Sequence, residues 1–109
     1  MNELIKNAQE FLDSGEENLK KERFNVAVSD FFKAIVIFCD YFIYKDIKII
    51  PKNHNERFSL LENYFPLVYS KVSNLFKTYV KSYNLRLNKN DTLNIKNYAY
   101  ELKNIADKK

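Results

Sequence analysis

Residues 24–45 form the segment that most restricts how this chain can fold. Large apolar residues recur there at steps of three and four, so a helix of 3.6 residues per turn would carry them on one broad stripe. Val26, Ile37 and Tyr44 lie together on another side of the same helix. A helix that is apolar on nearly all sides lies in the middle of a bundle or buries its second side in a partner. We therefore predict a bundle around this helix, with Val26, Ile37 and Tyr44 as candidate residues of a dimer interface.

Apolar residues with the same helical spacing recur in four other segments: 2–21, 54–64, 66–87 and 92–107. Asn53, followed three residues later by Glu56, suits a capped helix start. Pro66 suits the first turn of the next helix, and Asp91 suits the N-cap of the last one. The chain has one glycine and two prolines, too few turn residues for an all-β sandwich or barrel. We expect one all-α domain over residues 1–109, an antiparallel, up-and-down bundle of four to five helices.

Two small residues have predicted places in this bundle. Gly15 lies on the apolar stripe of the first helix, where its missing side chain would let a neighbouring helix approach closely. Cys39 lies in the main stripe of residues 24–45, so we expect a core residue and not a nucleophile. With one Cys and one His, the chain alone can form neither a disulfide nor a Cys/His zinc site. We expect no metal and no cofactor.

Positive charge is concentrated in the second half of the chain, where residues 56–109 carry ten basic and five acidic side chains. No acid occurs in residues 66–90. Such a stretch attracts an anionic partner such as nucleic acid, and it equally suits a solvated helix face. One hypothesis is therefore a nucleic-acid binder that uses Lys71, Lys77 and Lys81.

Two single residues stand out for their chemistry. Helical spacing places Arg86 on the apolar side of residues 66–87, where its charge must meet a carboxylate, an aromatic ring or an anion, or reach water from a fraying helix end. His54 is the only imidazole, suited to general-base work near neutral pH or to a local hydrogen bond. The candidate residues for binding an anion or nucleic acid are Arg86, Lys52, His54, Arg57, Lys77 and Lys81.

Two carboxylates, Asp30 and Asp40, interrupt the apolar surface of residues 24–45. We expect them to mark a solvent seam or to pair with lysines. At the start of the chain, residues 1–6 lack the basic region and apolar run of a signal peptide. The longest strictly apolar run, residues 34–39, is far shorter than the roughly 20 residues that a membrane span needs. We expect a cytoplasmic protein without a membrane partner.

Three phrases in order along the chain resemble HEPN domains: RFNVAVSDFFKA at 23–34, PKNH at 51–54 and YNLRL at 83–87. HEPN domains are small helical bundles of prokaryotic nucleotide-binding and toxin–antitoxin systems. The resemblance implies an antiparallel bundle that commonly forms a homodimer. It also implies either RNA cleavage or an accessory role beside a minimal nucleotidyltransferase.

Nuclease members of that family use an arginine followed, after four to six residues, by a histidine. Here the positions at those distances from Arg86 hold Asp91, Thr92 and Leu93, so the histidine is missing. The resemblance therefore favours a non-catalytic subunit that binds a nucleotide or a partner protein. An RNA-binding protein or a ribonuclease that uses Arg86 and His54 is the alternative.

A second resemblance covers one unit of a tetratricopeptide repeat. The matching residues are Phe11, Gly15, Phe24, Ala27, Phe31 and Ala34. Shifting the sequence by 34 residues gives no second copy. This resemblance implies a repeat-like helical hairpin, and a protein-interaction module is a further alternative.

Overall fold

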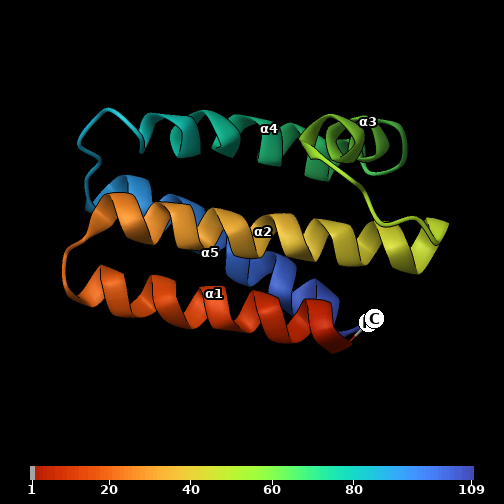
Figure 1. Cartoon of the computed structure of the whole chain (residues 1–109), viewed down its shortest axis with the longest axis horizontal. Helices are drawn as coiled ribbons and strands as arrows, with labels where there is room; N and C mark the ends of the chain where they lie inside the picture. Colours follow the sequence, from red (N-terminus) through yellow and green to blue (C-terminus); the bar gives the residue numbers. More distant parts are fainter. Residues whose placement is uncertain (1) are drawn as a thin grey trace.

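The computed structural model describes residues 2–109, which form helices without any strand. In chain order the helices are α1 (Asn2–Lys20), α2 (Phe24–Ile47), α3 (His54–Tyr64), α4 (Pro66–Lys81) and α5 (Lys89–Asp107). Figure 1 shows α1 and α2 as an antiparallel hairpin, with α3 and α4 on one side of it and α5 behind. The predicted all-α helical bundle is confirmed.

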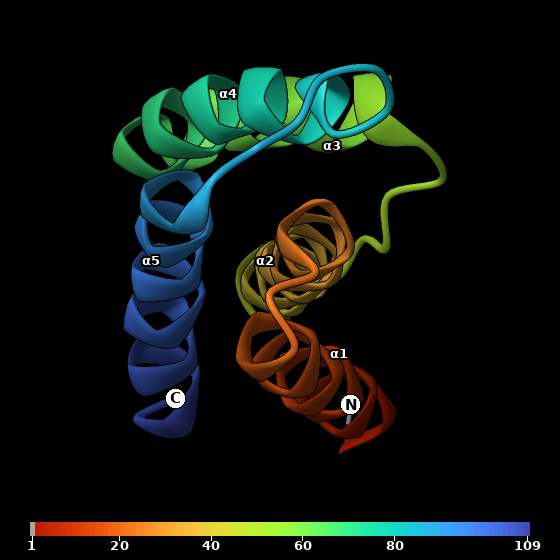
Figure 2. The ribbon, with the colours of Figure 1, turned by 90° about the vertical axis from the view of Figure 1, so that its left-hand side faces the viewer.

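Helix α2 lies at the centre of the molecule. All four other helices pack against it, and half of its 24 residues are buried. Figure 2 views α2 nearly end-on, with α1 below it, α5 to its left, and α3 and α4 above it. The side of α2 that faces right in this view has no helix over it. Three sides of α2 therefore pack against other helices in the core. The fourth side of this apolar helix faces solvent.

Gly15 sets the close approach of α1 to α2. A Cβ atom at this position would lie 2.7 Å from Cε1 of Phe31, closer than such atoms approach. The predicted role of Gly15 is confirmed. Cys39 is fully buried in the core, and burial raises the pKa of its thiol far above the ordinary value, so its placement as a core residue is confirmed as well.

Two of the three residues predicted to mark helix starts, Asn53 and Pro66, lie where they were expected. Asn53 Oδ1 accepts a hydrogen bond from the Glu56 amide at 2.8 Å, and Pro66 occupies the first turn of α4. Helix α5, however, begins before Asp91. Asn88 is its N-cap, and Asp91 completes the capping box by accepting a bond from the Asn88 amide at 3.0 Å. Asp91 is thus the third helical residue instead of the cap.

The prediction of one helix over 66–87 is wrong, because α4 ends at Lys81. Asn25 of α2 holds the chain that follows. Its amide donates to the carbonyls of Ser82 at 2.8 Å and Leu85 at 2.6 Å, and its Oδ1 accepts from the Leu87 amide at 3.0 Å. These bonds replace the helical bonds that the same backbone groups would otherwise make. The result is a turn that directs the chain into α5.

Candidate binding cavity on the uncovered side of α2

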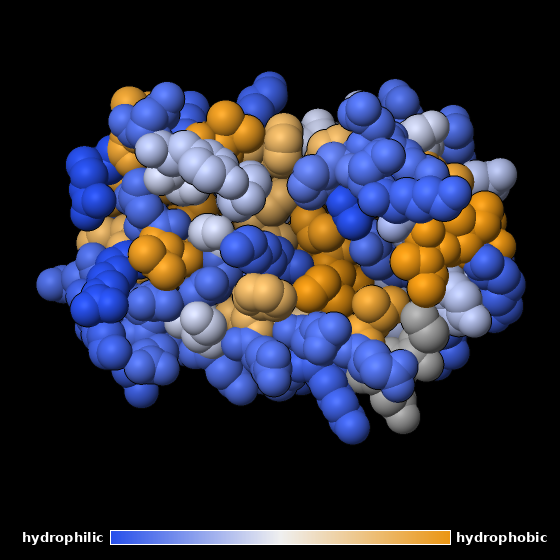
Figure 3. Space-filling view, viewed as in Figure 1, coloured by the Kyte–Doolittle hydropathy of each residue, from blue (hydrophilic) through white to orange (hydrophobic). Residues whose placement is uncertain are grey.

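A cavity of about 430 Å³ lies on the uncovered side of α2. Figure 3 shows apolar side chains exposed along the middle of this face, between α1 and the layer of α3 and α4. Most of the cavity wall is apolar. The apolar residues come from three helices: Phe11 of α1, Phe32, Val36 and Ile37 of α2, and Tyr79 of α4. The rings of Phe32 and Tyr79 stack with centroids 4.7 Å apart. The apolar wall therefore includes flat aromatic surface.

A buried ion pair lies beside the cavity. Arg57 of α3 donates from Nε to Asp40 Oδ1 at 2.7 Å and from Nη2 to Asp40 Oδ2 at 2.9 Å. Both residues are buried, and the two parallel bonds hold the guanidinium in a fixed plane. Asp40 pairs with this arginine and not with a lysine or with solvent, so that expectation is wrong. Asp40 already balances the charge of Arg57, and the role of Arg57 in binding an anion stays a prediction.

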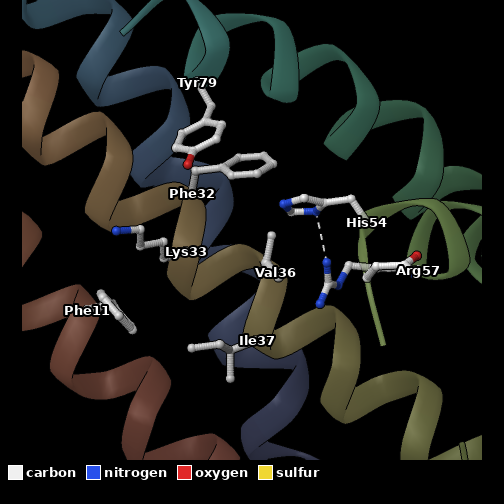
Figure 4. Close-up of a pocket in the computed structure, with 9 residues that line it drawn as sticks. Phe11, Phe32, Lys33, Val36, Ile37, His54, Arg57 and Tyr79 are labelled. Carbon is white, nitrogen blue, oxygen red and sulfur yellow. Dashed lines mark hydrogen bonds between the residues drawn. The ribbon is translucent and has the colours of Figure 1, made fainter. Parts of the chain in front are cut away.

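His54 is held by the same arginine. Its Nδ1 lies 2.9 Å from Arg57 Nη1 and accepts a hydrogen bond, since a guanidinium can only donate. The proton of the neutral ring is therefore on Nε2, which points into the cavity (Figure 4). Burial and the charge of Arg57 lower the pKa of His54, whereas the Asp40 carboxylate raises it. The ring is thus a neutral hydrogen-bond donor at pH 7.

The other polar side chains of the cavity are donors as well. Lys33 extends from α2 with its Nζ 5.7 Å from the centre of the Phe11 ring. Asn53 lines the cavity too, and its Oδ1 is occupied by the Glu56 amide, which leaves its NH₂ group free to donate. Tyr79 OH shares a 2.8 Å hydrogen bond with Tyr83 OH. The polar part of the wall therefore presents N–H groups, while the Asp40 carboxylate is committed to Arg57.

The lowered pKa of His54 gives a direct test of this geometry. We expect an NMR titration of its imidazole, the only one in the chain, to give a value below the ordinary 6.5 or so. The unfolded chain then binds the proton of His54 at a higher pH than the folded chain does. The free energy of unfolding should therefore decrease as the pH falls from about 6.5 to the pKa of His54 in the folded state. The Lys81→Ala variant serves as the control and leaves the value unchanged. A pKa at or above 6.5 would contradict the described hydrogen bond.

Arg86 does not lie on the apolar side of a helix, and this prediction is wrong. Because α4 ends at Lys81, Arg86 falls in the connection to α5, where it is exposed. That connection and α3 lie toward opposite ends of the molecule in Figure 1. Arg86 and His54 therefore do not converge within one chain.

The predicted lysines are all exposed; Lys77 and Lys81 lie one helical turn apart on α4, whereas Lys52 belongs to another part of the chain. Lys52 belongs to the connection before α3, next to Asn53 of the cavity. On α4, helical spacing places Lys77 and Lys81 away from buried Val72 and therefore outside the cavity.

The three predicted dimer residues lie on α2. Val26 is 48 % exposed, Ile37 lines the cavity, and Tyr44 is half-buried with Lys48 Nζ 5.5 Å from its ring centre. Their role in a dimer stays a prediction.

One residue of the cavity lining was not predicted from the sequence, and the expectation for Asp30 on the same helix is wrong. Lys33 was not singled out, although it interrupts the apolar pattern of α2 and so could have been found. Asp30 is buried and not at a solvent seam: its Oδ2 accepts from Ser14 Oγ at 2.7 Å and from Asn18 Nδ2 at 3.0 Å. Both donors belong to α1, so Asp30 helps fasten the α1–α2 hairpin.

No group of three or more His, Cys, Asp and Glu side chains within residues 2–109 is placed to hold a metal ion. In the same residues, no helix is both long enough and apolar enough to cross a membrane. Comparisons with protein families, with curated proteins and with solved structures find no match to this chain.

Proposed function

We propose that this chain is a non-catalytic module that binds a nucleotide in the cavity beside α2. The observation that supports this proposal is the character of the polar wall: Lys33, Asn53 and His54 offer N–H donors, while the Asp40 carboxylate is held by Arg57. A donor-rich wall with one uncompensated cation favours a ligand that carries acceptors and negative charge.

The apolar wall fits the remaining part of such a ligand. A volume of about 430 Å³ falls in the range of roughly 300–1,000 Å³ that is usual for small-molecule sites. Phe11 and Tyr79 supply aromatic surface for a flat base, and base stacking on aromatic side chains is sequence-tolerant. In this arrangement His54 Nε2–H and the Asn53 amide donate to the edge of the base, and Lys33 binds the phosphate.

The proposal agrees with the nucleotide-associated role that the resemblance to HEPN domains implies. It does not use Arg86, which lies in the α4–α5 connection, or Lys77 and Lys81, which face away from the cavity. The ribonuclease alternative needs Arg86 and His54 from different chains, since one chain keeps them apart.

Calorimetric titration with AMP tests the proposal. We expect Lys33→Ala to weaken AMP binding by about tenfold or more, because a hydrogen bond to a charged group contributes about 1.5–3 kcal/mol. Ile37→Trp would fill the cavity and abolish binding. Lys77→Ala is the matched control, since it removes an equal charge from an exposed helix position outside the cavity. Absence of AMP binding to the unaltered protein, or an equal loss in Lys77→Ala, would refute the proposal.

A further inference from the structure

Two consecutive residues, Asn53 and His54, each present an N–H group to the cavity beside α2. Asn53 Oδ1 accepts from the Glu56 amide at 2.8 Å, so the NH₂ group is the end of that side chain left free to donate. His54 Nδ1 accepts from Arg57 Nη1 at 2.9 Å, so the imidazole proton lies on Nε2. The edge of a ligand beside these two residues therefore meets two donors.

A buried carboxylate determines which nitrogen of His54 donates. Asp40 accepts from Nε and Nη2 of Arg57 at 2.7 and 2.9 Å, and Nη1 of the same guanidinium is directed at the imidazole. Because a guanidinium cannot accept a hydrogen bond, the neutral ring cannot carry its proton on Nδ1. Asp40 and Arg57 are thus positioning residues that make His54 a donor toward the cavity.

Within residues 2–109, the side chains that line the cavity offer a ligand hardly any acceptor in return. Four of them are hydrocarbon, and Lys33 and Arg57 can only donate. The exception is the hydroxyl of Tyr79, which lies apart from His54 (Figure 4). A ligand that placed its own N–H group against His54 would leave both donors unpaired, and such a mismatch is what a polar site rejects most strongly.

Guanine is the base whose edge matches two neighbouring donors. Its major-groove edge carries two adjacent acceptors, O6 and N7, whereas adenine places its N6 amino group, a donor, beside N7. Thymine offers one acceptor on this edge, and cytosine offers a donor. We propose that the cavity prefers a nucleotide whose base is a 6-oxopurine, such as guanine, with Asn53 and His54 donating to O6 and N7. This inference rests on the proposed function.

The other polar groups of guanine, N1–H and the N2 amino group, are donors as well. They have to face water, and the site allows this because Asn53 and His54 are both exposed and hold the base near the surface. Adenine cannot avoid the conflict in this way, because its amino group is next to the N7 atom that the two donors would bind.

Calorimetric titration with purine nucleotides tests the preference. We expect GMP to bind about tenfold or more tightly than AMP, because AMP leaves one of the two donors without an acceptor. IMP has the O6 atom of GMP but no N2 amino group, and it should bind like GMP since that amino group faces water. The GMP analogue 7-deaza-GMP lacks the N7 acceptor and should bind several-fold more weakly than GMP.

His54→Phe tests the donor. Phenylalanine keeps a flat ring at this exposed position, where the imidazole lies 5.9 and 5.7 Å from the ring centres of Phe58 and Phe76, but it has no N–H group. We expect it to weaken GMP binding by about tenfold and AMP binding much less. Lys33→Ala is the control: it removes a phosphate contact that both nucleotides share, so it should weaken both equally. Circular dichroism verifies the fold of each variant.

The failure of this inference and the failure of the proposed function are distinguishable. If AMP bound as tightly as GMP, or if His54→Phe weakened both nucleotides by the same factor, the base preference would be wrong and the nucleotide site would stand. If neither GMP nor AMP bound to the unaltered chain, the proposed function would fail, and this inference would fail with it.

Discussion

Replacing Arg57 with methionine is expected to destabilise the protein by about 3–5 kcal/mol, because it leaves a buried carboxylate without its partner. Asp40 is only 8 % exposed, and both of its oxygens accept from Arg57. Urea unfolding followed by circular dichroism measures the loss. The matched control is Lys21→Met, which removes the exposed ion pair between Lys21 and Glu17 and should cost no more than about 1 kcal/mol.

A double variant separates the ion pair from general packing. Asp40→Leu combined with Arg57→Met replaces both charges with apolar side chains, and we expect it to recover most of the lost stability. If the double variant were as unstable as Arg57→Met, the loss would come from the shape of the arginine and not from an orphaned charge. The same double variant frees His54 Nδ1 and should raise the pKa of His54, since Arg57 lowers it more than Asp40 raises it.

Gly15→Val is the second substitution with a large expected effect. A Cβ atom at this position would lie within 2.9 Å of three ring atoms of Phe31, which is fully buried in the core. Overpacking of this kind costs about 1–3 kcal/mol, and two further methyl groups place valine at the upper end of that range. Thermal unfolding should show a lower midpoint, even though valine suits a helix better than glycine does.

Two further variants test the cause of that loss. Glu10→Val places the same side chain at an exposed position of α1 and should change stability by only about 0.5 kcal/mol. Phe31→Leu removes part of the ring that the introduced valine side chain would strike, so adding it to Gly15→Val should cost less than the sum of the two single losses. Strictly additive losses would show that the contact between α1 and α2 is not the reason.

Most of the fold could be predicted from apolar spacing, because the helix pattern is local. Asn53 marks a helix start through a hydrogen bond within its own turn, Pro66 marks one through its fixed backbone angle, and Gly15 lies on a stripe that is visible in the sequence. The end of α4 could not be predicted in this way. Residues 82–87 continue the apolar spacing, but Asn25, which is 57 to 62 residues earlier in the chain, binds their backbone.

The candidate site was predicted only in part, for the same reason. From the sequence, His54 and Arg57 were candidates for binding an anion, and a local hydrogen bond of His54, which the structure contains, was the other possibility. What changes their chemistry is Asp40, which is 17 residues away from Arg57 and on a different helix. Once that carboxylate neutralises the guanidinium, the arginine orients the imidazole. A pairing between helices follows from the packed structure and not from the spacing along one helix.

The bonds of Asn25 also have a consequence for the topology of the chain. They hold the start of α2 next to the residues that precede α5, so the part of the chain between these two points forms a closed loop. The connection before α3, residues 48–53, lies within this closed path. Since the entropy of closing a path grows only with the logarithm of its length, lengthening that connection by a few glycines should hardly change the free energy of folding. The same insertion between Ser82 and Leu87 would separate the three backbone groups that one amide holds together.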